Sequence, residues 1–291
     1  MTSFLKSAKI GIVALNWKFE MSKSSDFLKR IAAYGFEGLQ ISVEQANSDA
    51  FLNQMNENKL ATAEQYLDIA CDENGPLSTA DSHAKEIVDA AIRAGVMMLV
   101  FAVDGTKDRD IYAGRAHLGP KLNENGYRRL ADHISKYAAL AKSAGMRSSF
   151  HPHAATFIET PEETRKLMAL LDRDLVGMCL DVGHWLVGGG DPVQGVIEYG
   201  RRVTHVHIKD VDPEILKKLV AGEYEGMHAA VEDHYLFVPA GEGALDLAGL
   251  FNELEKLNFS DWMMSEQDKA REPAEEKSGV SMRNIKAALG R

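Results

Sequence analysis

Short apolar runs alternate along the chain with longer, charge-rich amphipathic segments. The amphipathic segments place apolar residues at helical spacing, as in "HAKEIVDAAIRAG" (83–95), which ends in a glycine stop. Another segment with a helix signal is "TPEETRKLMALLD" (160–172), where Thr160 and Glu163 form a capping box at a helix start. The apolar runs are rich in residues typical of buried strands and fall at 9–15, 38–43, 60–67, 96–103, 146–151, 176–181, 203–209 and 261–266. Of these, the run at 60–67 has the weakest strand pattern.

Eight repeats of a strand followed by a helix predict a parallel sheet that closes into a barrel. We therefore expect an α/β fold with a single (β/α)8 TIM barrel over residues 1–291, because no linker-like stretch marks a domain boundary. Two strand-to-helix connections are long, near residues 104–126 and 210–245. Such loops often form the wall of a binding site, although they are equally often surface loops without a function.

Composition and charge narrow the class of protein. The chain is 45% hydrophobic and 26% charged, as in ordinary globular proteins. Its longest apolar run, 96–103, is too short to cross a membrane. We find no signal peptide, and Cys71 and Cys179 form no CxxC motif, so a reducing cytoplasm is expected. The net charge of −10 argues against nucleic acid as the main partner.

Polar side chains collect where the predicted strands end, which is the catalytic face of such barrels. Trp17 and Glu44 follow the first two strands, and we take them as candidate substrate-binding residues. His151 and His153 end the fifth strand and are assigned the same role. Carboxylates or imidazoles end each of the last four strands, in "FHPHAATFIE", "LDVGH", "HVHIKD" and "SEQD".

Asp181, His207 and Glu266 lie at the ends of three neighbouring predicted strands. Two carboxylates and an imidazole suit a divalent ion such as Mn²⁺, Mg²⁺, Co²⁺ or Zn²⁺ with positions open to substrate. Each residue alone has a structural explanation, such as a helix cap for Asp181 or an ion pair for Glu266. Together, at matching strand ends, they predict a metal site.

The fourth ligand has two candidates, Glu159 and His151. Alternation along the fifth strand turns His151 into the barrel, and Glu159 lies just before the capped helix. A carboxylate is the more usual ligand of a hard cation, and a third one would give Lys209 a charge to balance. These arguments favour Glu159, although an exposed residue at a helix start explains it nearly as well.

Lys209, His184 and Glu266 are the candidate catalytic residues. In "THVHIKD" (204–210), His205, His207 and Lys209 share one strand face, and we expect His205 to be a core residue. At a barrel mouth, the Lys209 ammonium would neutralise an enolate oxygen or move a proton. A salt bridge with Asp210, or with an acid on a neighbouring strand, is the structural alternative. His184 would orient a ligand or contact a substrate oxygen, unless it only bonds backbone.

The segment "CLDVGHWLVGGGDPVQGVIEYGRRVTHVHIKDVD", with "FHPHAATFIET" before it and "MMSEQD" after it, carries a family resemblance. It resembles the xylose-isomerase-like barrel superfamily of sugar isomerases and epimerases, and within it the inosose (2-keto-myo-inositol) dehydratases. The resemblance implies that Asp181, His207 and Glu266 bind the metal. Many members carry a glutamate at the position of His151, so this chain departs from the pattern there.

We therefore expect a divalent-metal-dependent isomerase, epimerase or dehydratase that acts on a keto-sugar or inosose-like keto-polyol through an enediolate. Two alternatives belong to other classes. An abasic-site endonuclease shares the fold, but the acidic balance and the lack of a second ligand motif in "MHAAVEDHYLF" (227–237) count against it. A non-catalytic sugar-binding barrel would keep the pocket without the metal. The expected partner is a small sugar or polyol, and the outer helices leave a homo-oligomer open.

Overall fold

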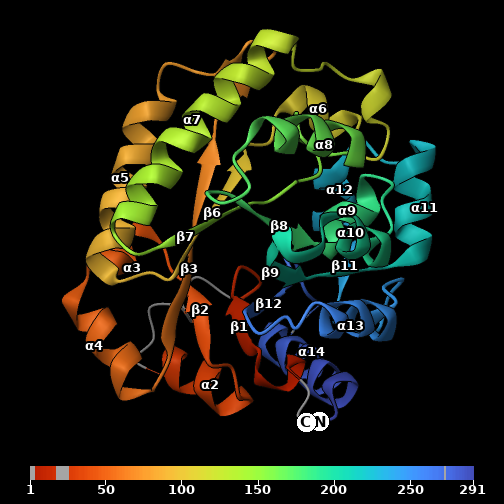
Figure 1. Cartoon of the computed structure of the whole chain (residues 1–291). Helices are drawn as coiled ribbons and strands as arrows, with labels where there is room; N and C mark the ends of the chain where they lie inside the picture. Colours follow the sequence, from red (N-terminus) through yellow and green to blue (C-terminus); the bar gives the residue numbers. More distant parts are fainter. Residues whose placement is uncertain (1–3, 18–25, 272) are drawn as a thin grey trace.

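A closed barrel of eight parallel strands forms the centre of the protein (Figure 1). The computed structural model describes residues 4–17, 26–271 and 273–291. The strands are ordered β1-β12-β9-β8-β7-β6-β3-β2 around the ring. Their bounds are β1 Lys9–Val13, β2 Gly38–Gln40, β3 Ala61–Ile69, β6 Met98–Val103, β7 Arg147–Phe150, β8 Gly177–Asp181, β9 Val203–Ile208 and β12 Trp262–Glu266. All eight expected strands are present, including the weakly patterned third, so the predicted (β/α)8 barrel is confirmed.

Helices surround the barrel and bury their apolar stripes against it (Figure 1). Gly95, with φ of 62°, ends α5 as expected. The predicted capping box at Thr160 and Glu163 is also present at the start of α8. The main helices are α2 Phe27–Tyr34, α3 Val43–Ala46, α4 Asp49–Glu57, α5 Ala80–Ala94, α7 Glu124–Ser143, α8 Pro161–Leu170, α9 Val182–Val187, α10 Pro192–Tyr199, α13 Leu247–Lys256 and α14 Ala274–Leu289. None of the helices in these described ranges is long and apolar enough to span a membrane.

Strand register brings the functional side chains to one level. In the β8–β9 pair, Cys179 lies opposite His205 and Asp181 lies opposite His207. Val206 and Ile208, which alternate with the histidines, belong to the apolar core shared with the helices. His205, His207 and Lys209 therefore face the barrel interior, as strand alternation predicts.

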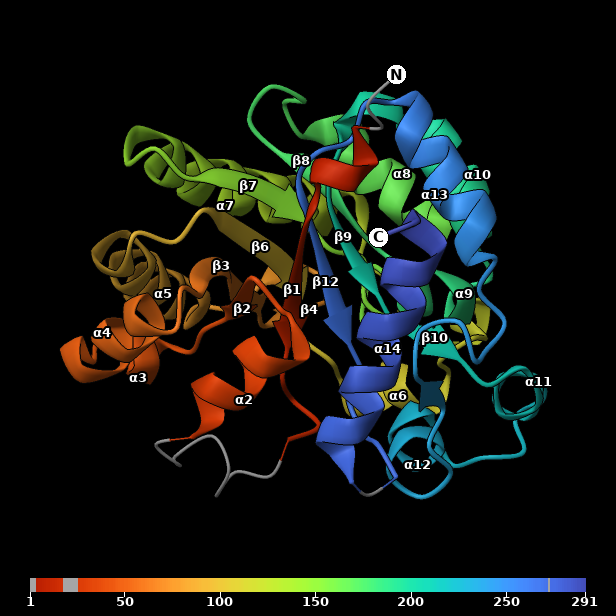
Figure 2. The ribbon, with the colours of Figure 1, turned by 90° about the horizontal axis from the view of Figure 1, so that it is seen from below.

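The two long connections carry secondary structure of their own. Residues 104–126 include α6 Lys107–Ile111 and the 3-10 turn Ala116–Leu118. Residues 210–245 include α11 Pro213–Ala221, α12 Met227–Glu232 and the hairpin of β10 Asp210–Val211 with β11 Phe237–Val238. Figure 2 shows α6 and α12 beyond the arrowhead of β12. Both connections thus cover the carboxyl end of the barrel.

Asp210 anchors the second connection. Its buried carboxylate accepts hydrogen bonds from the backbone N–H groups of Gly241, Gly243 and Leu245 at 2.8–3.0 Å. These bonds fix the loop after β11 against the end of β9. Asp210 is therefore a structural acceptor, and the ion pairs of Lys209 are made with other residues.

Candidate metal centre

Four buried side chains converge at the carboxyl ends of β7, β8, β9 and β12. His151, Asp181, His207 and Glu266 each offer one ligand atom, and these atoms lie within 4.8 Å of one another. Nδ1 of His207 is 2.7 Å from Oε2 of Glu266, and Nε2 of His151 is 3.2 Å from Oδ2 of Asp181. Two imidazoles and two carboxylates form a mixed nitrogen and oxygen set that suits divalent manganese, cobalt or zinc.

Neighbouring groups turn the ligand atoms toward the centre of the cluster. Oδ1 of Asp181 accepts a hydrogen bond from the backbone N–H of His184, which leaves Oδ2 facing the histidines. Nε2 of His207 faces Glu64 at 2.9 Å, which leaves Nδ1 for the cluster. Burial alone would lower the pKa of His207, but Cys179, Glu64 and Glu266 outweigh burial and raise it well above its usual range. The ligand atoms of two buried carboxylates and two imidazoles converge at this point, so the residues fit a bound cation.

Glu64, on β3, is the acidic group beneath the cluster that the sequence analysis missed. It is fully buried and contacts Nε2 of both His205 and His207. Burial opposes its ionisation, but His207 and His205 outweigh burial and lower the pKa of Glu64 to about 2. A carboxylate bonded to the far nitrogen of a ligand histidine fixes the orientation of the ring. His205 is buried in the core, as expected, but only its Nε2 has a partner, and its Nδ1 makes no hydrogen bond within the described residues.

The structure does not bring Glu159 to the cluster. Its carboxylate accepts hydrogen bonds from the backbone N–H groups of Gly114 and Ala155 at 2.8 and 2.7 Å. Arg109 lies 4.0 Å away, and burial raises the pKa of Glu159 to about 7. Glu159 thus joins the two loops above β6 and β7, and the fourth position of the cluster is taken by the other candidate, His151.

Lys209 lies beside the cluster, with its ammonium group close to three partners. Nζ is 2.7 Å from Oδ1 of Asp268, 2.9 Å from Oε1 of Glu266 and 2.9 Å from Nε2 of His184. Burial would lower the pKa of Lys209, but Asp268 and Glu266 outweigh it and raise the pKa. The side chain therefore stays an ammonium ion. Gly183 permits this placement, since a Cβ there would come within 2.8 Å of the Lys209 side chain.

Aromatic rings form one side of the site. The rings of His153 and His184 contact each other at a tilt of 35° with centroids 3.6 Å apart, and His184 packs edge-on against Phe237. Burial, followed by His153 and Lys209, lowers the pKa of His184 well below its usual range. A neutral His184 can accept the hydrogen bond from Lys209. Beside this wall lies a hollow of about 230 Å³, which His151, His153, His207, Glu266 and Asp268 line together with Val13, Leu15, Gln40 and Tyr66.

Comparison with known proteins identifies the family. The family model described as "Xylose isomerase-like TIM barrel" matches residues 28–288. The chain belongs to this family. It is 27% identical over 285 residues to an inosose dehydratase of Clostridium beijerinckii, covering 91% of this chain and 92% of that protein. It is 34% identical over 167 residues to the inosose dehydratase of Clostridium botulinum strain Alaska E43, covering 57% of this chain and only 54% of that protein.

Solved structures also share the fold. The IOLI protein, crystallised with a bound zinc atom, superposes with a TM-score of 0.71 at 16% identity, covering 97% of this chain and 98% of that one. The match of the family model over residues 28–288 confirms the family resemblance found in the sequence. At this identity the match to IOLI shows the fold, and its zinc belongs to IOLI.

Two of the expected substrate-binding residues lie elsewhere in this xylose isomerase-like barrel. Trp17 is buried in the core, where its ring packs edge-on against Phe27 and its Nε1 donates to Ser278. Glu44 is exposed in the first turn of α3. Neither lines the hollow beside the cluster. Residues beyond the end of a strand follow no strand alternation, so the strand-end positions of Trp17 and Glu44 were a weak guide.

Partial sequence signals exist for other residues that lie at the cluster or the hollow. Glu64 and Tyr66 alternate on β3 and both face inward, but the run at 60–67 had the weakest strand pattern. Asp268 stands two positions after Glu266 in "SEQD", just beyond the end of β12, and lines the hollow. Gln40 ends β2 and carried no distinguishing signal.

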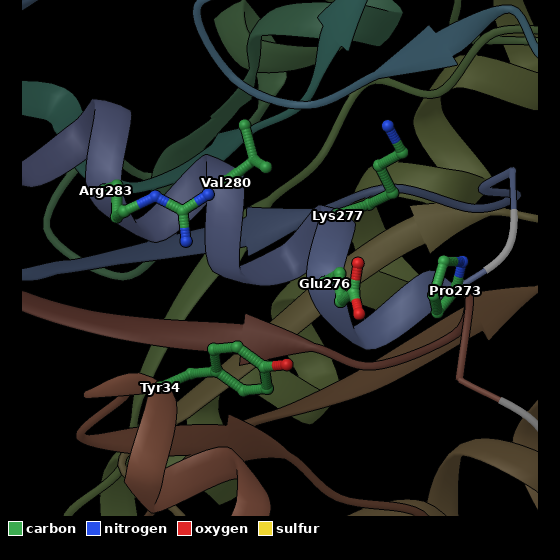
Figure 3. A pocket seen from close by; sticks show the side chains of 6 residues that line it. All are labelled: Tyr34, Pro273, Glu276, Lys277, Val280 and Arg283. Atoms are coloured by element: carbon green, nitrogen blue, oxygen red, sulfur yellow. The ribbon is translucent and has the colours of Figure 1, made fainter.

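A second hollow of about 410 Å³ lies between α2 and α14 (Figure 3). Tyr34, Glu276 and Arg283 line it, with Pro273, Lys277 and Val280. It lacks the imidazoles and the converging carboxylates of the cluster. The smaller hollow beside His151 is therefore the candidate substrate pocket.

Proposed function

We propose that the chain is a divalent-metal-dependent dehydratase, epimerase or isomerase of a keto-polyol or keto-sugar, with an inosose-type substrate first among these. The observation that carries the proposal is the convergence of His151, Asp181, His207 and Glu266 beside a buried ammonium group. The inosose dehydratase relatives support the substrate class. We place the reaction in the cytoplasm, with a small molecule and no nucleic acid as partner.

The four ligand residues define where the substrate is activated. When bound, a divalent ion there would polarise the substrate carbonyl and make the adjacent C–H group more acidic. His151, Asp181, His207 and Glu266 hold that position, while Gln40 and Tyr66 across the hollow offer hydrogen-bonding groups for substrate hydroxyls. The hollow is small compared with the about 300–1,000 Å³ of pockets for drug-sized ligands, which suits a monosaccharide or a cyclitol.

Lys209 is the group that we assign to the developing negative charge. Of its three partners, Asp268 is the most exposed, at 24% of its side-chain surface. A substrate oxygen can therefore replace Asp268 on the ammonium without disturbing Glu266 or His184. Lys209 then stabilises the enolate oxygen, or donates a proton to the hydroxide that leaves in a dehydration. His184 orients Nζ through their 2.9 Å contact.

Glu266 connects the two parts of the site. Oε2 faces Nδ1 of His207 and Oε1 faces Nζ of Lys209. A carboxylate that contacts both the cation position and the ammonium fixes the distance between them. In this arrangement the substrate carbonyl and the adjacent hydroxyl would meet two positive groups, the cation and the Lys209 ammonium, and the Glu266 carboxylate contacts both.

NMR of reaction mixtures in D₂O tests the proposal. The protein is loaded with Mn²⁺, Co²⁺ or Zn²⁺ and incubated with a panel of inososes and keto-sugars. We expect one substrate to exchange a carbon-bound proton for deuterium and to give a product that has lost water or changed configuration. Metal-stripped protein should give neither. If the metal-loaded protein binds a panel member without exchange or product, the chain is a sugar-binding barrel instead.

A further inference from the structure

A hollow of about 160 Å³ opens at the amino end of the barrel. Arg147 at the start of β7, Gly177 at the start of β8 and Thr204 near the start of β9 all line it. The ligand cluster lies at the carboxyl ends of these same strands. The hollow is therefore separated from the candidate metal centre by the length of the barrel.

Positive charge dominates this hollow. Its lining includes one carboxylate, Asp174, and five cations, which are Lys142, Arg147, Arg173, Arg201 and Arg202. The chain as a whole carries a net charge of −10. A concentration of guanidinium groups in an acidic protein is costly unless each one has a local partner.

Three of the five cations have such partners. Arg147 forms two hydrogen bonds with Asp261, at 2.8 and 3.0 Å. Arg202 donates to the carbonyl oxygens of Met168, Leu171 and Val176, and so satisfies the end of α8. Lys142 approaches the carbonyl oxygen of Asp174 at 3.4 Å.

The remaining two, Arg173 and Arg201, are exposed and make no hydrogen bond or ion pair with any residue that the structure describes. Arg173 also acts on its neighbour, because burial and then the charge of Arg173 lower the pKa of Arg202. Two free guanidinium groups thus stand beside a third whose positive charge is already disfavoured. Negative charge in the hollow would relieve all three.

Ser148 supplies an independent observation. Its side chain lines the same hollow and is 5% exposed, yet its Oγ has no hydrogen-bonding partner in the described part of the chain. Buried hydroxyl groups are normally paired, because an unmet donor costs free energy. Ser148 thus offers an unused donor in the wall of the hollow.

We propose that this hollow is a second binding site, distinct from the catalytic one, for a small oxyanion of the phosphate class. The forked guanidinium groups of Arg173 and Arg201 match the tetrahedral arrangement of phosphate oxygens, and the Ser148 hydroxyl donates to another oxygen. The volume suits a phosphoryl group. The ligand is inorganic phosphate or the phosphate end of a small monoester.

Calorimetric titration of the metal-loaded protein tests this, with inorganic phosphate in one arm and glucose 6-phosphate in the other, at constant ionic strength in chloride. We expect saturable binding of one phosphate per chain. The Arg173→Gln/Arg201→Gln double variant should bind about tenfold more weakly or worse, and Ser148→Ala should show a smaller loss. Arg128→Gln removes an exposed charge from α7 outside the hollow and should bind like the unaltered protein. Tighter binding of the ester than of phosphate identifies a phosphate monoester as the ligand.

The metal centre is the competing location for an added anion. Asp181→Asn removes one of its ligands and should leave phosphate affinity unchanged if the anion binds at the amino end of the barrel. Loss of binding in Asp181→Asn, with normal binding in the double arginine variant, would overturn the proposal. So would the absence of saturable binding in the unaltered protein.

Discussion

Oε2 of Glu64 lies 2.9 Å from Nε2 of His207, on the opposite side of the imidazole ring from Glu266. The ring is therefore held between two carboxylates, one in the cluster and one beneath it. The contact fixes which nitrogen faces the cluster and makes that nitrogen a better electron donor.

Glu64→Gln should weaken metal binding by about 10- to 100-fold, because the neutral amide no longer supports His207 with a negative charge. Competition with a chelating indicator measures the dissociation constant of Zn²⁺ or Co²⁺ on the folded protein. Glu57→Gln, which alters an exposed residue at the end of α4, is the matched control. Equal affinities in the two variants would show that Glu64 only fills space.

His151→Gln should weaken metal binding far more than Glu159→Gln does. His151 offers Nε2 to the cluster, whereas both oxygens of Glu159 are occupied by backbone N–H groups. Metal content after dialysis against a weak chelator separates the two variants. The opposite order would return Glu159 to the ligand set, as the sequence alone had favoured.

Glu159 should also make stability depend on pH. Burial raises its pKa from 4.5 to about 7, so the folded state holds this proton more tightly than the unfolded chain. Its stabilising contribution is then fully present below about pH 4.5 and is lost as the pH rises through about 7. Relative to Glu159→Gln, the protein should lose roughly 3 kcal/mol of unfolding free energy between pH 4 and pH 8. Urea unfolding of both proteins across this range measures the difference, and parallel profiles would contradict it.

Lys209→Met should lower turnover by roughly 10²- to 10³-fold while metal content stays near that of the unaltered protein. The ammonium group contacts Glu266 only through Oε1, and Oε2 remains available to the cluster. Turnover is measured per folded molecule, because Asp268 loses its buried partner. Lys217→Met on the exposed face of α11 serves as the control. A protein that is less stable but equally active would make Lys209 a structural residue.

Strand periodicity was enough to place most of the cluster. Asp181, His207 and Glu266 were found because each lies at or next to the end of a strand and because the three strands are parallel neighbours. Alternation also gave the inward direction of His151. These inferences depend on backbone geometry that is the same in every barrel, so they need no knowledge of loops.

Residues outside the strands could not be placed in this way. Glu159 is held by Gly114, which stands 45 positions earlier in another connection. The position of Trp17 depends on its packing against α2 and α14. Glu64 lies on a strand, but its contact with His207 spans 143 positions and joins strands that are not neighbours in the sheet. No local pattern encodes such contacts.

The ring order has a consequence for how the protein is made. β12 pairs with β1 on one side and with β9 on the other, so the barrel stays open until this last strand is in place. β12 also carries Glu266. A nascent chain that lacks it has an unpaired edge on β1 and an incomplete ligand set, and the pairing across almost the full sequence makes closure a late event in folding. Tight metal uptake during synthesis would therefore report that the ring has closed.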